Sequence, residues 1–213
     1  MFIVNEMVCE EIIFRGKRVF LFGSRHSDNS GQLDLIKRSI EDFNPDIVLV
    51  EGNFDTATFN SAEDAIRYGR EQGYASFISK ERSIPLESND PPHGNDRKFI
   101  EDKYDAETNE LYFLLRKFSP KTTNKEKERI KMLLKKILNE NFDDSKNYSD
   151  YFNPALSINL FNRITKELNV FRDEFMLNKI GDLLKRYSKI FIIKGDYHLN
   201  VNLENIREIV NDS

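Results

Sequence analysis

The sequence predicts an α/β protein with a mixed, largely parallel sheet flanked by helices, and three observations carry that prediction. Short apolar runs alternate along the chain with segments whose apolar residues fall at helical spacing. Two of these runs end in a Gly-x-x-His tetrapeptide, which is typical of a strand that breaks into a loop. A strongly charged helical block lies between the two ends of the chain. We therefore expect one domain over residues 1–213, with a helical insertion near 105–150.

The N-terminal part of the chain reads as a hairpin followed by alternating helices and strands. Asn44-Pro45-Asp46 ends the first helical pattern, and Ser61-x-x-Asp64 resembles a capping box that opens the second. Pro85 favours a strand start or an edge strand. The expected elements are strands at 11–14 and 18–22 joined by a tight turn, a helix at 32–42, a strand at 47–50, a helix from 61 to about 73 and a strand at 84–87.

The C-terminal part is mainly helical. Asn153-Pro154 is a good N-cap and first-turn pair. The many lysines between 123 and 139 favour a solvated helical face over a basic binding patch. We expect the block at 105–150 to form a lid or a flank over the strand-end site. The expected elements are helices at 105–118, 123–139, 153–168 and 170–186, a strand at 190–194 and a final helix near 202–210.

Composition limits the classes of partner and compartment. The net charge is −4 with both signs interspersed, so we expect no nucleic-acid partner. Cys9 is the only cysteine, which excludes an internal disulfide and a cysteine-built zinc site. No apolar run approaches about 18 residues, and the N-terminal sequence does not resemble a signal peptide. We therefore expect a cytoplasmic protein without a membrane anchor, and its oligomeric state is left open. A small-molecule or peptide substrate is expected from the site residues and motifs described next, and not from composition.

Four candidate site residues come directly after predicted strands: His26, Glu51, Glu87 and His198. In open α/β sheets the carboxyl ends of the strands collect catalytic groups, and we expect each glycine of the two Gly-x-x-His motifs to turn the backbone sharply toward that edge. Two imidazoles and two carboxylates suit a divalent metal with an open water position, or metal-free general-base catalysis. Each residue could instead make an ordinary loop hydrogen bond or ion pair, and Arg172 could be either a substrate clamp or part of a structural ion pair.

Five short motifs in order make the chain similar to the TraB/PrgY, GumN and Tiki family, within a superfamily that includes erythromycin esterases and ChaN-like haem-uptake proteins. Ser24 stands where the family has threonine, and Gly52-Asn53 departs from its usual sequence. The matching segments are Gly23-Ser24-Arg25-His26, the run from Pro45 to Glu51, Leu86-Glu87, Arg172-Asp173-Glu174-Phe175-Met176 and Gly195-Asp196-Tyr197-His198-Leu199.

The resemblance implies a metal-dependent hydrolase of amide, peptide or ester bonds, because Tiki members depend on manganese or cobalt; zinc is a further candidate. It implies a catalytic set in which His26, Glu51 and His198 are metal ligands or water-activating groups. In the same set Glu87 is a further ligand or an orienting residue, and Arg172 is a substrate clamp. Two alternatives remain open, a metal-free hydrolase like the erythromycin esterases and a non-catalytic module for haem or a small molecule, with Tyr197 as the axial ligand. The expected substrate-binding residues are Ser24, Arg25, Asp173 and Tyr197.

Overall fold

The computed structural model describes residues 2–4, 7–25, 29–54, 58–119, 121–143 and 160–213. The chain divides into two compact units, which we call the sheet unit (Met1–His93 with Arg172–Ser213) and the helical unit (Gly94–Phe171). The predicted α/β class is confirmed. The helical unit spans more of the chain than the insertion predicted at 105–150. The expected role of that insertion as a lid or flank stays a prediction.

The described residues of the sheet unit form a six-stranded sheet in the order β1-β2-β3-β6-β4-β5. β1 and β2 and then β2 and β3 pair antiparallel, whereas the three remaining pairs are parallel. The carboxyl ends of β3, β6, β4 and β5 therefore lie along one edge of the sheet. The strands are β1 (Phe2–Val4), β2 (Met7–Phe14), β3 (Lys17–Ser24), β4 (Ile47–Val50), β5 (Leu86–Ser88) and β6 (Lys189–Gly195).

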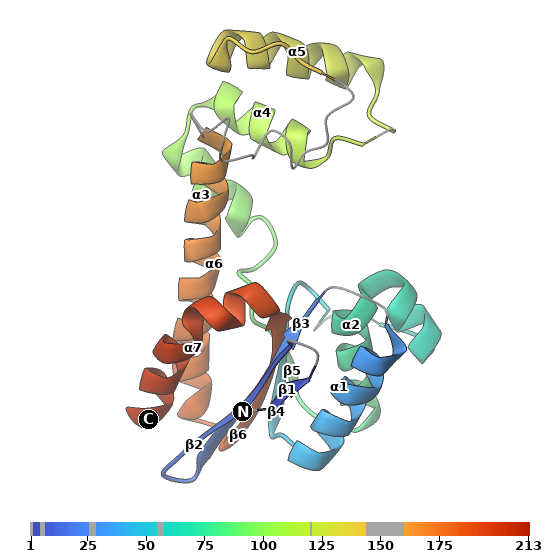
Figure 1. The fold of residues 1–213 in the computed structure, drawn as a ribbon, viewed down its shortest axis with the longest axis vertical. Coiled ribbons are helices and arrows are strands. Elements are labelled where there is room, and N and C mark those ends of the chain that lie inside the picture. Colours follow the sequence, from blue (N-terminus) through green and yellow to red (C-terminus); the bar gives the residue numbers. More distant parts are fainter. Residues whose placement is uncertain (1, 5–6, 26–28, 55–57, 120, 144–159) are drawn as a thin grey trace. The chain divides into compact units, whose positions relative to one another are not determined.

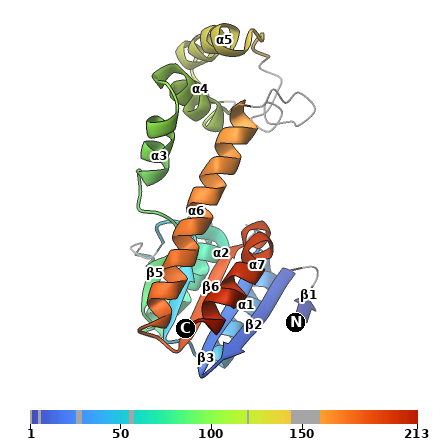
Figure 2. The same cartoon turned by 90° about the vertical axis from the view of Figure 1, so that its left-hand side faces the viewer.

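Helices cover both faces of this sheet, as Figures 1 and 2 show. α1 (Ser30–Phe43) and α2 (Ala62–Glu81) lie on one face. α7 (Asp196–Asn211) and the C-terminal part of α6 (Leu160–Leu184) lie on the other. Each face has its own apolar core, so the central strands are buried on both sides and need apolar residues throughout.

Successive side chains of β4 point to opposite faces of the sheet and so pack against different helices. Val48 and Val50 pack into the core under α1 and α2. Ile47 and Leu49 pack into the core under α6 and α7. Because successive side chains of a strand point to opposite faces, Glu51 continues on the side of α6.

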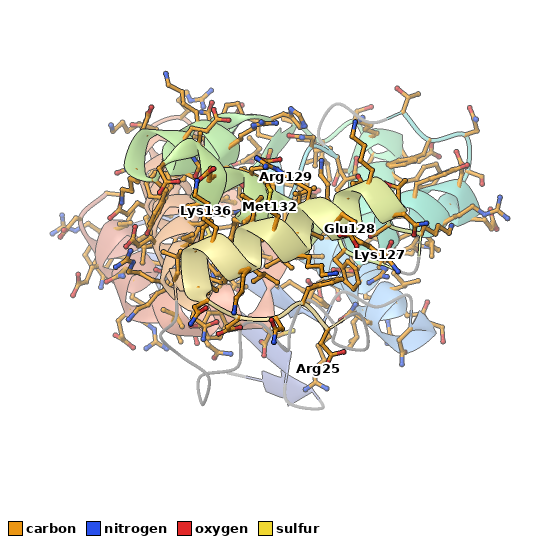
Figure 3. The ribbon with its side chains drawn as sticks, turned by 90° about the horizontal axis from the view of Figure 1, so that it is seen from above. Arg25, Lys127, Glu128, Arg129, Met132 and Lys136 are labelled. Atoms are coloured by element: carbon orange, nitrogen blue, oxygen red, sulfur yellow. The ribbon has the colours of Figure 1, made fainter. Side chains whose placement is uncertain are left out.

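The helical unit has a core of its own, built from the inward faces of α3 (Asn95–Lys103), α4 (Ala106–Arg116), α5 (Asn124–Leu138) and the first turns of α6. α5 begins with a capping box in which Thr123 and Glu126 satisfy each other's backbone N–H groups. Figure 3 looks onto α5, whose outer face carries Glu128 and Met132. The helices predicted at 105–118 and 123–139 are confirmed.

Three predicted boundaries were wrong. α6 is continuous from Leu160 to Leu184, so no break separates two helices near residue 169. α2 extends to Glu81 rather than ending near residue 73. α7 begins at Asp196, directly after β6, because the acidic side chain in its first turn suits a helix N-terminus. The predicted Asn153-Pro154 helix start lies outside the described residues.

No helix within the described part of the chain is long and apolar enough to cross a membrane.

Candidate functional site

Four charged side chains form a connected cluster at the carboxyl edge of the parallel strands. The Lys194 ammonium of β6 lies 2.9 Å from Asp90 Oδ1, and the Arg172 guanidinium of α6 lies 2.5 Å from Asp90 Oδ2. The same terminal nitrogen of Arg172 lies 3.3 Å from Glu51 Oε1. The Lys194 side chain has no exposed surface, and that of Asp90 is 9% exposed. The cluster therefore consists of two cations and two anions that are nearly removed from water.

Asp90 is the centre of this cluster. Burial alone would raise the pKa of its carboxyl group. The positive charges of Lys194 and Arg172, with the hydrogen bonds that both donate, outweigh burial and hold the pKa below its usual value. Asp90 also accepts a hydrogen bond from the backbone N–H of Gly52 at 3.0 Å, which fixes the loop after β4.

Glu51 joins this cluster to the start of α7. Its Oε2 accepts a hydrogen bond from the backbone N–H of Gly195 at 3.0 Å. Its own backbone N–H donates to Gln72 Oε1 of α2 at 2.8 Å. The predicted placement of Glu51 at the sheet edge is therefore correct, and its carboxylate is held by Arg172 and by the backbone at the end of β6.

A sharp kink in α2 precedes two polar residues, Glu71 and Gln72, whose side chains contact the carboxyl ends of β3 and β4. Arg70 has φ 48° and ψ −135°, a backbone conformation that costs a non-glycine residue about 1–3 kcal/mol. A Cβ at Gly69 would lie 2.7 Å from the Phe54 ring, so the segment before the kink needs a residue without a side chain. After the kink, the buried Glu71 accepts a hydrogen bond from Ser24 Oγ at 3.1 Å.

His198 lies in the first turn of α7 and is held by a carboxylate. Its Nδ1 lies 2.8 Å from Asp173 Oδ1, and both side chains are nearly buried. Asp173 follows Arg172 on α6, so neighbouring residues of one helix hold the cluster and the histidine. Tyr197 is exposed, and its ring meets the His198 ring edge-on at 5.6 Å between centroids.

An open hollow of about 330 Å³ adjoins the charged cluster. One part of its wall is formed by Glu51, Asp90 and Arg172, and another by the kinked part of α2. The lining residues are Glu51, Gly52, Phe54, Tyr68, Gly69, Arg70, Glu71, Gln72, Asp90 and Arg172.

The structure does not bring Glu87 into this cluster. Glu87 pairs with Leu49 across the sheet and so points to the face that α6 covers. There its carboxylate lies 2.9 Å from Lys179 Nζ. Lys179 is seven residues beyond Arg172, about 10 Å further along the helix. Asp90, three residues after Glu87, takes the place predicted for that carboxylate.

The other predicted residues have different outcomes. His26 lies outside the described residues, so its predicted convergence with His198 stays a prediction. Ser24 is buried and bonds to α2, whereas the Arg25 side chain is exposed. Gly23 has an ordinary strand conformation, so its predicted role in a sharp turn was wrong. A Cβ there would lie 2.4 Å from Asp196 Oδ1, so this glycine instead permits close contact with α7.

Sequence reasoning missed Lys194, Asp90 and the polar pair on α2. Lys194 carried a usable signal, because it is a charged residue that directly follows the apolar run 190–193 and precedes Gly195. Asp90 carried a weaker signal, as the second of two polar residues that follow β5. Nothing in the sequence around Gln72 indicated that it would bond to the backbone of Glu51.

The predicted metal ligands fit a divalent ion unevenly. The Glu51 carboxylate is already bonded to Arg172 and to the Gly195 N–H. A metal cation at Glu51 would be repelled by the positive charges of Arg172 and Lys194. His198 fits better, because metal-bound histidines usually give their other ring nitrogen to a carboxylate, as His198 does to Asp173. Within the described residues, no group of three or more His, Cys, Asp or Glu side chains could hold a metal ion.

Comparison of the chain with models of known protein families finds no match, and comparison with curated proteins also finds none. The resemblance to the TraB/PrgY, GumN and Tiki family therefore stays a prediction.

Proposed function

We propose that this protein is a hydrolase of amide or ester bonds in which His198, oriented by Asp173, is the general base. The observation that carries the proposal is the 2.8 Å contact between His198 Nδ1 and Asp173 Oδ1. A carboxylate bonded to Nδ1 keeps the proton on that nitrogen, so Nε2 carries the lone pair that can accept a proton. His198 is one helical turn from Gly195, whose N–H binds Glu51 beside the hollow.

The proposed reaction uses water as the nucleophile. His198 Nε2 takes a proton from water while the water oxygen adds to the substrate carbonyl carbon. The negative charge that develops on the carbonyl oxygen is stabilised by Arg172, the cation of the cluster that lines the hollow. The protonated His198 then gives its proton to the leaving nitrogen or oxygen, and the bond between carbonyl carbon and leaving group breaks.

Two side chains that could compete with water as nucleophile are poorly suited to it. Burial, together with the smaller effect of the negative charge of Asp196, raises the pKa of the Cys9 thiol to about 11, so little thiolate exists at neutral pH. Ser24 Oγ is buried and is committed to Glu71 and Gln72 of α2. These contacts favour direct attack by water.

A metal-dependent form of the same hydrolase is the second candidate. The carboxylate–histidine pair is also the arrangement that orients a metal-bound imidazole, and the family resemblance implies manganese or cobalt. His198 would be a ligand through Nε2, and the ion would lower the pKa of its bound water. The haem-binding alternative places its axial ligand at Tyr197, which is exposed beside His198.

The test uses the hydrolysis of p-nitrophenyl esters and N-benzoyl amino acid p-nitroanilides by the full chain. We expect His198→Gln to lower kcat by a factor of about 10²–10⁴ because it removes the general base. Asp173→Asn should also lower kcat, by up to about 10⁴, because an amide can favour the wrong histidine tautomer. His93→Gln is the matched control, since His93 is exposed in the loop before the helical unit.

The outcomes separate the candidates. Full activity of His198→Gln would falsify the proposed role of His198. Loss of activity on treatment with a chelator, restored by manganese, cobalt or zinc, would favour the metal-dependent candidate. Absence of hydrolysis together with a Soret band on adding haem would favour the binding module.

A further inference from the structure

The hollow beside the charged cluster has walls in which the two signs of charge are balanced. Its lining contains three carboxylates and two guanidinium groups, and the buried Lys194 ammonium, 2.9 Å from one of the carboxylates, is a third cation. A ligand with a net charge of either sign therefore meets groups of its own sign beside groups of the opposite sign. The ionisable residues of the lining are Glu51, Arg70, Glu71, Asp90 and Arg172. These walls favour a neutral ligand over an anion or a cation.

Hydrogen-bond donors and acceptors lie side by side in the same lining. One terminal nitrogen of Arg172 lies 3.3 Å from Glu51 Oε1 and 2.5 Å from Asp90 Oδ2. A hydroxyl group donates and accepts through one oxygen atom, so it can donate to a carboxylate while it accepts from the neighbouring guanidinium. An ammonium group only donates and a carboxylate only accepts. The mixed lining is therefore suited to hydroxyl groups, and hydrogen bonds to charged partners are stronger than those between neutral groups.

Two aromatic residues, Tyr68 and Phe54, line the hollow as well. Tyr68 is 69% exposed, so its ring is open to a ligand. Phe54 lies so close to Gly69 that a Cβ there would be 2.7 Å from its ring, and the next residue, Arg70, has the strained conformation described above. Backbone strain of this kind clusters at active sites and ligand clamps. The tyrosine ring offers a flat apolar surface on which the C–H groups of a ring-shaped ligand can pack.

We infer that this hollow binds a neutral sugar, so that the substrate class is that of sugars carrying an O-acyl or N-acyl group. Its volume of about 330 Å³ lies at the lower end of the range for small-molecule sites. The sugar hydroxyls contact the mixed lining around Glu51, the C–H face of the ring packs on Tyr68, and the acyl carbonyl lies toward Arg172.

The reaction assigned to this substrate rests on the proposed hydrolase. Water adds to the acyl carbonyl carbon, and the bond from that carbon to the sugar oxygen or nitrogen breaks. The products are a carboxylic acid and a sugar with a free hydroxyl or amino group. The binding of the sugar can be measured without turnover.

The test compares small ligands in calorimetric titrations of the full chain. N-acetyl-D-glucosamine is the neutral sugar, D-glucosamine carries an ammonium group, D-glucuronate carries a carboxylate, and N-acetylglycinamide is a neutral diamide without hydroxyls. We expect N-acetyl-D-glucosamine to bind at least about fivefold more tightly than each of the others, because it alone is both neutral and hydroxylated. Its affinity should be nearly the same in dilute and in concentrated salt, because salt screens the interactions of charged ligands.

The matched variants change the aromatic surface. Tyr68→Ala should weaken the binding of N-acetyl-D-glucosamine by a factor of about 2–10, whereas Tyr68→Phe keeps the ring and should keep the affinity. Arg67→Ala is the control, because this neighbouring exposed residue does not line the hollow. Since Tyr68 is largely exposed, the melting temperature should stay the same in all three variants, which separates loss of binding from loss of structure.

The outcomes distinguish this inference from the proposed function. His198→Ala should bind N-acetyl-D-glucosamine like the unchanged protein, and sugar binding without any hydrolysis would support the inference while overturning the hydrolase. Hydrolysis of the p-nitrophenyl esters without binding of any sugar would overturn the inference alone. Equal binding of N-acetyl-D-glucosamine and N-acetylglycinamide, tighter binding of either charged sugar, or unchanged affinity in Tyr68→Ala would also overturn it.

Discussion

The ion pairs at the carboxyl edge of the sheet and those on α5 of the helical unit use the same residue types but differ in their exposure to water. The Lys194 side chain is 0% exposed and its partner Asp90 is 9% exposed. On α5, Lys136 is 61% exposed and its partner Glu107, on α4, is 39% exposed. A buried charge without a partner is costly, whereas an exposed one is solvated by water. Losing one partner of the buried pairs at the sheet edge is therefore expected to cost much more stability than losing one partner of the exposed pairs of the helical unit.

The largest effect is expected when the buried pair is broken from one side. Asp90→Asn leaves the Lys194 ammonium buried without a negative partner and removes a strong acceptor of Arg172. We expect the free energy of unfolding to fall by about 3–5 kcal/mol, measured by urea denaturation of the full chain.

The matched control removes both charges of the pair. In Asp90→Asn combined with Lys194→Met, an apolar side chain of similar length fills the site of Lys194, and most of the lost stability should return. A double variant no more stable than Asp90→Asn would mean that the cost lies in packing or in Arg172 rather than in the lysine charge.

A smaller effect is expected from acid. The lowered pKa of Asp90 means that its contribution to stability is present above its ordinary value of 3.8 and is lost as pH falls through its lower value in the folded protein. Unfolding monitored by circular dichroism should therefore show stability declining below pH 3.8. The decline should be shallower in the double variant without Asp90 and Lys194; identical pH profiles would contradict this assignment.

The smallest effect is expected on α5. Lys136→Gln breaks the exposed pair with Glu107 and should change the free energy of unfolding by at most about 1 kcal/mol. Concentrated salt should reduce even this difference, because it screens exposed charges. A loss as large as that of Asp90→Asn would remove the distinction between the two regions.

Strands buried on both faces of the sheet could be predicted from the sequence. The runs 47–50 and 190–193 are apolar throughout because helices cover both of their faces. A continuous apolar run of this length is enough to predict a buried strand. The choice between Glu87 and Asp90 depends on where β5 ends and on which face each side chain occupies, which a three-residue strand does not reveal. The kink at Arg70 lies next to a close approach of Gly69 to Phe54, which is fifteen residues earlier in the chain and is not evident from the sequence pattern.

The close approach of Gly23 to Asp196 bears on how this protein can change during evolution. The two tetrapeptides that contain these residues are far apart in the chain, yet the glycine of one touches the first helical residue of the other. A mutation that adds a side chain at position 23 must displace the Asp196 carboxylate and crowd its Cα, at the start of the helix that carries His198. The two positions are therefore expected to vary together, and a search for distant relatives should score them as a pair.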